Sequence, residues 1–359
     1  MEEVTPPVEP VGGRPAIAWT ADEVRAFLGH YSMRPRRLRV TQLKSWWWNL
    51  VLLVEADEQR LVLRRYGITP AEEVLWELAL LEHLLAHGFP TFSPLRRTDG
   101  ATLGSFGGKP AILYPFVEGN NGCQSVDPLH AMTETAKLVA RMHDLTRDLV
   151  LSHPRVHSGS DSRRTIRQLL QFVQEHGLAS PEHDLRELAT HAARYLDAFE
   201  ARLAPYERDL PRGIVHHDAH CANVLFHDGR LVALIDFDDA CPGYLIADLA
   251  VMLANWAEDR HSHGLVGNRA TQLLRAYEQH RPLTGVEREL LPDFLVLFTL
   301  SDAAAHVQGQ LEQGVPASVA VSECHRYRSF LQHIADPNWR SMLDIGGMTG
   351  RAGNEAAVS

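Results

Sequence analysis

The chain has 359 residues, of which 45% are hydrophobic and 22% are charged, and its formal net charge at pH 7 is -10. This composition is ordinary for a globular protein with enough apolar residues for two cores, and the acidic balance argues against a nucleic-acid partner. The start is acidic and proline-rich, unlike a signal peptide, and no apolar run approaches membrane-spanning length, so we expect a cytoplasmic protein without a membrane contact.

The first 118 residues are predicted to form a small antiparallel sheet with one major helix. After an N-terminal extension over residues 1–19, Thr20 and Glu23 fit a capping box that opens a short helix ending near residue 31. The major helix is predicted over residues 70–87, with proline at its start and glycine just past its end. Segments rich in Val and Leu predict strands at residues 38–43, 49–55, 61–65, 94–97 and 111–116.

From residue 119 to residue 336 the chain is predicted to be mostly helical. The expected helices cover residues 127–145, 163–176, 181–203, 244–256, 269–280, 287–313 and 317–334. The chain is therefore expected to have an α+β fold, with an N-terminal sheet domain and a helical C-terminal domain. The sequence beyond residue 336 is glycine-rich and weakly patterned, so residues 337–359 are expected to form a flexible tail.

A hairpin is predicted near the middle of the helical part. Two short apolar strands, residues 224–226 and 230–235, flank Asp228-Gly229, which is a strong two-residue turn signal. Folding the chain about this turn places Val224 opposite Ala233. The residues just outside the two strands therefore leave the hairpin at the same end.

The flanking residues carry the chemistry of the sequence. They are Asn223 and Asp236, whose amide oxygen and carboxylate can share a hard cation such as Mg²⁺. Asp218 lies far enough ahead of Asn223 in the loop to point at an incoming hydroxyl rather than at a metal. One compact segment thus combines a candidate base with two metal-binding side chains, an arrangement suited to phosphoryl transfer.

At these residues the chain resembles the aminoglycoside phosphotransferase and choline kinase superfamily, which has a two-lobed protein-kinase-like fold. The catalytic-loop pattern H-x-D-x-x-x-x-N is matched by His216, Asp218 and Asn223, and the metal pattern I-D-x-[DE] by Ile235, Asp236 and Asp238. The resemblance implies that Asp218 is the catalytic base and that His216 braces the loop. It also implies that ATP is the donor and that Mg²⁺ is held by Asn223, Asp236 and Asp238.

The expected nucleotide contacts depart from the family pattern. Arg64 occupies the place of the lysine that kinases of this superfamily carry on the third strand. Arginine can bind phosphate oxygens bidentately, but its planar guanidinium needs different room from an ammonium. The resemblance gives Arg64 a partner in Glu77 on the following helix, with Glu73 as a rival and a solvent-facing Glu77 as the plain alternative.

Two further segments are expected to face the nucleotide. Residues 111–119, with Tyr114 and Phe116, match the hinge whose backbone reads adenine in this family, and a plain edge strand is the alternative. The first strand turn, with Ser45, lies where the family covers the phosphates, but it lacks the glycines that allow close approach. Trp46–Trp48 in this turn are interpreted as a packing patch, with an aromatic lid or a protein contact as the alternative.

Acidic residues near the expected site have supporting roles. Asp248 lies among apolar residues at the start of a helix, and a buried carboxylate needs partners because desolvating it alone is costly. By resemblance Asp248 braces the catalytic loop, although a simple helix-face aspartate is the alternative. Asp238 and Asp239 are also candidates for contacts behind the metal ligands or with an ammonium-bearing substrate.

A metal-hydrolase alternative arises from the crowd of histidines in the loop. Imidazoles and a carboxylate at His216, His217, Asp218 and His220 are good ligands for transition metals. Their spacing differs from the H-E-x-x-H of zinc peptidases, and Asn223 with Asp236 favours oxygen-ligand chemistry. We therefore rank hydrolysis well below phosphoryl transfer.

The cysteine positions do not indicate a disulfide framework. They are scattered at Cys123, Cys221, Cys241 and Cys324, without a C-x-x-C pair. We therefore expect four reduced thiols, with neither a zinc site nor a disulfide.

Within the superfamily the chain looks most similar to the type II homoserine kinases, through residues 20–28, 97–111 and 277–283. These segments concern the scaffold more than the substrate. We predict a Mg²⁺-dependent kinase that transfers the γ-phosphoryl group of ATP to a hydroxyl of a small metabolite, with homoserine or another amino alcohol favoured. An antibiotic of the aminoglycoside type, a sugar or a protein Ser/Thr side chain is the alternative acceptor. A non-catalytic kinase-like binding protein, suggested by Arg64 and the glycine-poor turn, is the alternative of another class.

Overall fold

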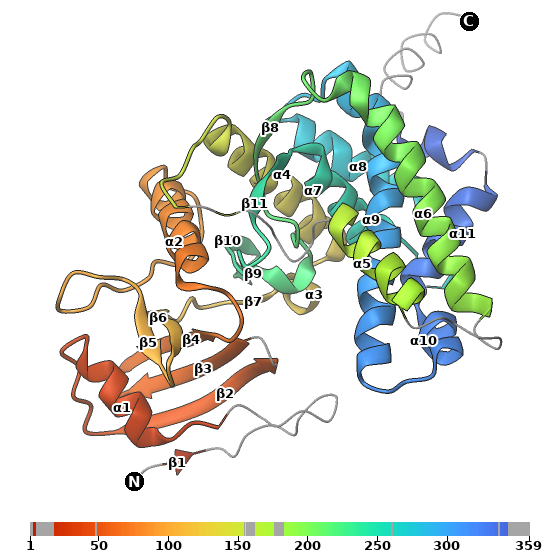
Figure 1. Cartoon of the computed structure of the whole chain (residues 1–359). Helices are drawn as coiled ribbons and strands as arrows, with labels where there is room; N and C mark the ends of the chain where they lie inside the picture. The colour runs from red at the N-terminus through yellow and green to blue at the C-terminus, as the bar shows by residue number, and fades with distance from the viewer. Residues whose placement is uncertain are drawn as a thin grey trace, which may run out of the picture. The chain divides into compact units, whose positions relative to one another are not determined.

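The computed structural model describes residues 3–4, 18–46, 49–153, 155, 162–175, 183–259, 261–336 and 338–343 (Figure 1). The chain divides into two compact units. Unit 1 comprises residues 1–120 with the short segments 150–155 and 232–235, and unit 2 comprises the remaining residues. The boundary that the sequence predicts, between residues 118 and 119, stays a prediction, and a single linear boundary does not anticipate the two returning segments.

Unit 1 contains a six-stranded sheet in the order β1-β2-β3-β4-β6-β5. Its strands are β1 (Glu3–Val4), β2 (Leu38–Trp46), β3 (Asn49–Ala56), β4 (Gln59–Tyr66), β5 (Gly104–Phe106) and β6 (Lys109–Pro115). The pairs from β2 to β5 are antiparallel, as predicted, and β1 adds a parallel pair with β2 that the sequence does not suggest.

The strand predicted at residues 94–97 is wrong. This segment is an extended connection whose Leu95 amide donates to the Leu113 carbonyl at 2.7 Å. Pro94 has no N–H to donate, so the segment cannot sustain a ladder. The strand paired with β6 at this edge is instead β5, with Gly104 opposite Ala111.

The two helices of unit 1 relate to opposite faces of β4. Helix α1 (Ala21–Gly29) begins with the predicted capping box, and its Phe27 packs in one cluster with Leu61 and Leu63. Because side chains alternate along a strand, Arg64 and Tyr66 point to the other face. There the Tyr66 hydroxyl donates to Glu77 on α2 (Ala71–Ala86) at 3.1 Å.

Unit 2 is mainly helical, as predicted. Its α-helices are α3 (Gly122–Ser125), α4 (Pro128–Thr146), α5 (Ser162–Glu175), α6 (His183–Leu203), α7 (Ile246–Met252), α8 (Gly267–Glu278), α9 (Gly285–Glu312), α10 (Ala317–Glu323) and α11 (His325–Ala335). The helix predicted over residues 244–256 starts later as α7 and continues as the π-helix η3 (Leu253–Ala257). The helix predicted over 317–334 breaks at Cys324, whose backbone is extended.

Helix α9 is the core helix of unit 2 and contacts α5, α6, α7, α10 and α11. Among the described residues it is the one helix long and apolar enough to cross a membrane, which corrects the expectation that no such run exists. However, 78% of its most apolar window is buried inside the protein. Burial by neighbouring helices explains why this helix is apolar nearly all round.

Short elements complete the fold. The predicted hairpin forms from β9 (Val224–His227) and β10 (Arg230–Leu234), with β7 (Asn120–Asn121) beside β9, and residues 232–234 of β10 are among the returning residues of unit 1. A second pair joins β8 (Arg212–Val215) to β11 (Cys241–Tyr244). Beyond the helix that ends at residue 335, η4 (Trp339–Leu343) has buried Trp and Leu side chains, so order continues past the predicted start of the tail at residue 337. Residues 344–359 lie outside the described part of the chain.

Candidate active site

The predicted catalytic loop, residues 216–223, begins where β8 ends, and a buried carboxylate fixes its first two residues. Asp248 on α7 accepts the His216 amide at 2.8 Å with Oδ2 and the His217 amide at 2.7 Å with Oδ1. His217 has φ +65°, a conformation that a non-glycine residue adopts only when its surroundings impose it. Asp248 thus holds a sharp change of backbone direction immediately before Asp218.

Asp248 is itself held by a chain of buried polar side chains. Its Oδ2 lies 2.9 Å from Nε2 of His143, and Nδ1 of His143 lies 2.6 Å from the Tyr277 hydroxyl. Arg281 donates to the same hydroxyl at 2.7 Å and to Glu287 at 2.5 Å. All five side chains are at most 3% exposed. Three helices, α4, α8 and α9, therefore contribute to the support of the loop.

The protonation states of these hydrogen-bonded side chains follow from which groups donate and which accept. Burial by itself raises the pKa of Asp248, but the hydrogen bond from His143 and the nearby histidines hold that pKa below its usual value. The carboxylate is therefore ionised, so Nε2 of His143 must donate to it. Nδ1 is then free to accept from the Tyr277 hydroxyl, whose oxygen accepts from Arg281.

The His216 ring lies inside the loop. The ring is fully buried, and its Nδ1 accepts the Asp218 amide at 3.2 Å. Phe237 packs edge-on against it, with ring centroids 4.7 Å apart. The ring nitrogen facing Asp218 is thus engaged by the backbone, which suits the predicted bracing role better than a zinc ligand. Among the described residues, no three His, Cys, Asp or Glu side chains gather as a metal site.

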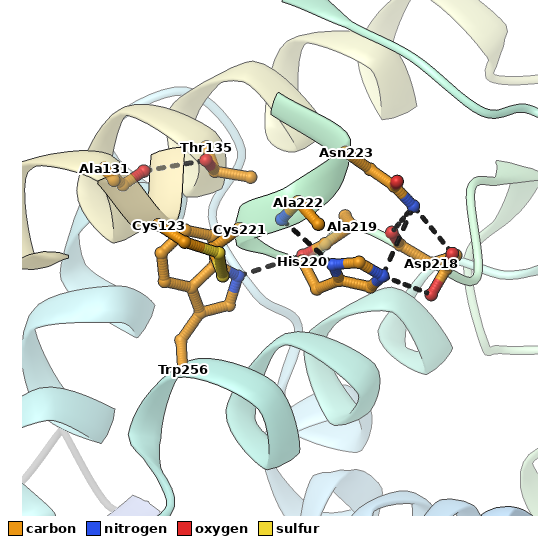
Figure 2. Close-up of a disulfide and its surroundings, with 10 residues drawn as sticks. All are labelled: Cys123, Ala131, Thr135, Asp218, Ala219, His220, Cys221, Ala222, Asn223 and Trp256. Atoms are coloured by element: carbon orange, nitrogen blue, oxygen red, sulfur yellow. Dashed lines mark hydrogen bonds and ion pairs between the residues drawn. A yellow bond between two sulfur atoms is a disulfide. The ribbon is translucent and has the colours of Figure 1, made fainter. Parts of the chain in front are cut away.

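The Asp218 carboxylate is oriented by two neighbours (Figure 2). Nδ2 of Asn223 donates to Asp218 Oδ2 at 2.6 Å and to the Asp218 carbonyl at 3.0 Å, and His220 Nε2 lies 3.3 Å from Oδ1. The Asp218 side chain is 36% exposed, whereas Asn223 is 4% exposed. A buried amide therefore presents a partly open carboxylate to the surface of unit 2.

The predicted metal ligands lie next to this cluster in the chain. Asn223 immediately precedes β9, and Asp236 follows β10 by two residues, so the hairpin brings both to the same end. Phe237, between Asp236 and Asp238, ties this segment to the His216 ring. Asp236 has φ +69°, a second imposed backbone conformation in the site.

This set of residues fits a hard cation. Both hydrogen bonds of Asn223 to Asp218 use Nδ2. Figure 2 shows the side-chain oxygen of Asn223 directed away from Asp218, and among the described side chains none donates a hydrogen bond to it. Amide and carboxylate oxygens are the ligands that Mg²⁺ prefers. The assignment of Asn223, Asp236 and Asp238 as metal ligands stays a prediction.

The nucleotide-side candidates belong to unit 1. Arg64 is 5% exposed and Glu77 is fully buried, and both lie close to Tyr66, since the Arg64 guanidinium is 5.1 Å from its ring centroid. The rival Glu73 is instead 3.6 Å from Arg155. Burial of Glu77 excludes the solvent-facing alternative, while the Arg64–Glu77 ion pair and its contact with phosphate stay predictions.

The hinge candidates are on and after β6. Tyr114 stacks on Phe92, with centroids 4.4 Å apart, and Phe116 lies under the Arg60 guanidinium at 4.0 Å. The Phe116 amide donates to the Arg60 carbonyl, so it is used within unit 1. Ser45 and Trp46 lie in β2, but their side chains, and Trp47 and Trp48 entirely, lie outside what the structure describes. Their predicted roles stay untested.

The cysteine prediction requires a correction. Cys123 on α3 and Cys221 in the 3-10 helix η2 (Cys221–Asn223) form a disulfide, and only Cys241 and Cys324 are free thiols. The two paired residues are 98 apart in sequence, and their spacing carried no signal because α3 meets η2 only in the folded chain. Sequence reasoning also missed His143 and Tyr277, whose isolated positions on helices look ordinary, and Arg281, which lies in the connection between α8 and α9.

Comparison with known proteins agrees with this geometry. Residues 39–283 match the phosphotransferase enzyme family. A homoserine kinase from Pseudomonas aeruginosa is 32% identical over 273 residues, which cover 76% of this chain and 81% of that protein. The kinase prediction is thereby confirmed at the level of the family.

Two solved structures share the fold at lower identity. An amicoumacin kinase in complex with AMP-PNP and Ca²⁺ has a TM-score of 0.67 at 18% identity, covering 90% of this chain and 94% of that one. A microcompartment-associated aminopropanol kinase has a TM-score of 0.64 at 17% identity, covering 90% and 98%. The predicted protein-kinase-like α+β fold is confirmed. With its family match spanning both the sheet of unit 1 and the catalytic loop of unit 2, this chain belongs to the phosphotransferase enzyme family.

Proposed function

We propose that this enzyme transfers the γ-phosphoryl group of ATP to the hydroxyl of a small, carboxylate-bearing amino alcohol such as homoserine, with Mg²⁺ as its cofactor. The observation that carries the proposal is the oriented, partly exposed carboxylate of Asp218 beside Asn223. The relative at 32% identity is a homoserine kinase, which supports the same substrate class. We propose a cytoplasmic location, in keeping with a metabolic substrate of this kind.

Asp218 is assigned the role of base. Its Oδ2 is occupied by the amide of Asn223, and His220 is near Oδ1 without burying it. An acceptor hydroxyl that donates to this carboxylate gives up its proton as its oxygen forms the new bond to phosphorus, and the bond from phosphorus to the ADP oxygen breaks. The hydrogen bonds that Asp248 accepts from the backbone of the loop keep the Asp218 carboxylate at a fixed position during this step.

Asn223, Asp236 and Asp238 are assigned to Mg²⁺. The cation, when bound, neutralises negative charge on the phosphate oxygens. The chain's own contribution is to keep these oxygen ligands at one end of the hairpin and to keep Asn223 buried. Arg64 is assigned to the phosphates and the hinge residues Tyr114 and Phe116 to the adenine, as the family resemblance implies.

A pocket of about 160 Å³ in unit 2 suits the acceptor. His217, next to Asp218 in the chain, lines it together with Arg163 of α5 and the aromatic rings of Phe199, Tyr244, Phe294 and Phe298. None of the described residues that line it is Asp or Glu. A polycationic aminoglycoside needs acidic partners, so this lining favours an acceptor with apolar surface and a negative group.

Arg163 is the residue expected to recognise the negative group. It is half-buried on the pocket wall, and no hydrogen bond or ion pair engages it within the part of the chain that the structure describes. A guanidinium in this situation can bind a carboxylate with two parallel hydrogen bonds. Homoserine offers a carboxylate, an ammonium and the hydroxyl to be phosphorylated.

The reaction is tested by measuring ADP formation with Mg²⁺ and ATP over amino alcohols, sugars and aminoglycosides. Homoserine is expected to give the highest kcat/KM. Asp218→Asn should lower kcat by about 100-fold or more while ATP binding persists, because only the proton acceptor is lost. Asp144→Asn, a change on the surface of α4, is the matched control. ATP binding without turnover of any acceptor would favour the non-catalytic alternative.

Substrate choice is tested by a pair of acceptors that differ only in the carboxylate, homoserine and 3-aminopropan-1-ol. Arg163→Ala should raise KM for homoserine by about 10-fold or more, the size of a charge-assisted hydrogen bond, and leave KM for aminopropanol nearly unchanged. The neighbouring exposed Arg164→Ala is the control. An equal rise of KM for both acceptors would refute recognition of the carboxylate by Arg163.

A further inference from the structure

A disulfide is built into the catalytic loop. Figure 2 shows Cys221 bonded to Cys123 one helical turn away from the Asp218–Asn223 cluster. Cys221 is the first residue of η2, and Asn223 is its last. The bond therefore connects the segment that carries a predicted metal ligand to α3, which lies 98 residues earlier in the chain.

The segment after Asp218 has few other anchors of its own. The Ala222 amide donates to His220 Nδ1 at 3.1 Å and the Asn223 amide to the His220 carbonyl at 3.0 Å, so these bonds stay within the loop. From outside the loop, Trp256 Nε1 donates to the Ala219 carbonyl at 2.9 Å. Apart from the main chain itself, the disulfide is thus the one covalent link between this segment and the helical part of unit 2.

Helix α3 packs closely against the residues on both sides of Asn223, so its position can affect theirs. A Cβ on Gly122 would lie 2.9 Å from Val224 Cγ2 and 3.3 Å from the Cys221 carbonyl, so glycine permits this approach. Val224 directly follows Asn223 at the start of β9. Moving α3 away from Cys221 would therefore release the main chain on both sides of Asn223.

The disulfide can be reached by a reductant. Cys123 is exposed and Cys221 is half-buried, whereas the free Cys324 is buried and burial raises the pKa of its thiol. An incoming thiolate attacks Sγ of Cys123, and Cys221 leaves as a thiolate that takes up a proton. A second thiolate then attacks the sulfur of the first thiol in this mixed disulfide, and Cys123 leaves as a thiolate that takes up a proton. Two external thiols are thereby oxidised to one disulfide, and both cysteines are reduced.

We propose that the Cys123–Cys221 disulfide is a redox switch of the catalytic loop: the oxidised form holds Asn223 beside Asp218, and reduction by a cellular thiol releases η2 and lowers turnover. Disulfides in a reducing compartment, such as the cytoplasm proposed for this enzyme, are transient and regulatory rather than structural. The activity readout rests on the proposed kinase function, while the structural readout described below does not.

The first measurement is of the bond itself. The full-length protein is equilibrated in glutathione buffers from oxidising to reducing, alkylated under denaturing conditions and analysed by peptide mass spectrometry. We expect two alkylated cysteines among the four under oxidising conditions and four after reduction. Failure of the Cys123–Cys221 pair to form in oxidised glutathione overturns the proposal.

The second measurement is hydrogen exchange with both redox forms. Reduction should speed exchange of the Ala222 and Asn223 amides and leave the His216 and His217 amides unchanged, because Asp248 still holds the latter pair. Equal exchange of all four amides in the two fully converted forms overturns the proposal. This result does not depend on any acceptor being phosphorylated, so failure of the proposed function is distinguishable.

Turnover supplies the third measurement. Reduction should lower kcat by about fivefold or more, a usual size for coupling between a switch and a site, and oxidised glutathione should restore it. Cys123→Ser should have the kcat of the reduced form and no response to glutathione. Cys324→Ala, which removes a buried free thiol, should keep the wild-type response. Identical kcat in both redox forms of the wild type contradicts the switch.

Discussion

The two ends of the catalytic loop are held in different ways. At its start, the His216 and His217 amides bind Asp248, which is fully buried. At its end, Cys221 is tied to the exposed Cys123 by a disulfide. The first anchor is electrostatic and shielded from solvent, whereas the second is covalent and open to solution.

The difference indicates what each anchor can do. A carboxylate that accepts two backbone amides and a histidine in the protein interior cannot exchange these partners for water without partial unfolding. A disulfide with an exposed sulfur can be opened by a small thiol while the fold persists. The start of the loop is therefore permanently positioned, and its end is adjustable.

The largest expected effect is at the permanent anchor. Asp248→Asn keeps the shape but turns one acceptor oxygen into a donor, so that His143 or a loop amide faces another N–H. Misplacement of Asp218 should lower kcat by about 100-fold, and disruption of the buried partners should lower the free energy of unfolding by about 3–5 kcal/mol. Steady-state kinetics and urea unfolding measure both. An active, stable variant would show that the loop keeps its position without this carboxylate.

The next largest effect is expected at the other end of the series of buried hydrogen-bonded side chains that begins at Asp248. Tyr277→Phe removes the hydroxyl between His143 and Arg281, and should lower the free energy of unfolding by about 1–3 kcal/mol with a smaller change in kcat than Asp248→Asn. Tyr206→Phe, whose hydroxyl lies at the surface 3.3 Å from Glu289, is the matched control. If both tyrosine variants unfold alike, the buried hydroxyl makes no special contribution.

These anchors also show which features of the structure can be predicted from the sequence. The hairpin was predictable because local signals specify it: Asp228 and Gly229 both have positive φ, as a two-residue turn between strands requires. The helices α1 and α2 carry their own caps and breakers in the same way. Patterns within a few residues of each other were sufficient for these parts of the fold.

The supports of the site depend on contacts between distant segments. His143 and Asp248 are 105 residues apart, and Cys123 and Cys221 are 98 apart. Nothing in the local sequence of α4 or α3 distinguishes these residues from ordinary helix residues. The role of Asp248 was predicted only from the family resemblance, and its partners could not be, because only the packing of helices brings them together.

A third variant compares the two anchors directly. Trp256→Phe removes the indole donor to the Ala219 carbonyl, between the two ends of the loop, and should lower the free energy of unfolding by about 1 kcal/mol and kcat by a few-fold. Combining it with Cys123→Ser gives a double-mutant cycle. Since both changes loosen the same segment, their effects on kcat should not add, and strict additivity would indicate that they act on separate segments.

The buried carboxylates of unit 2 extend the comparison. Asp248 accepts hydrogen bonds from three donors, and its pKa is lowered. Burial raises the pKa of Glu258 to about 7. The partner of Glu258, Arg326, also binds Asp302, Asn255 and the Ala254 carbonyl. A guanidinium divided among several acceptors compensates less for lost hydration. Burial alone therefore does not decide the charge of an interior carboxylate.

The smallest effect on turnover is expected at Glu258, because it lies outside the loop. A carboxyl whose pKa is raised in the folded state binds its proton more tightly there, so stability falls as pH rises from the unfolded pKa near 4.5 through about 7. Glu258→Gln removes this titration, and the variant should gain up to about 3 kcal/mol relative to the wild type across that window. Urea unfolding of both proteins between pH 5 and pH 8 gives the difference, in which the histidines common to both cancel. A difference independent of pH would mean that Arg326 keeps Glu258 ionised, as the three donors keep Asp248.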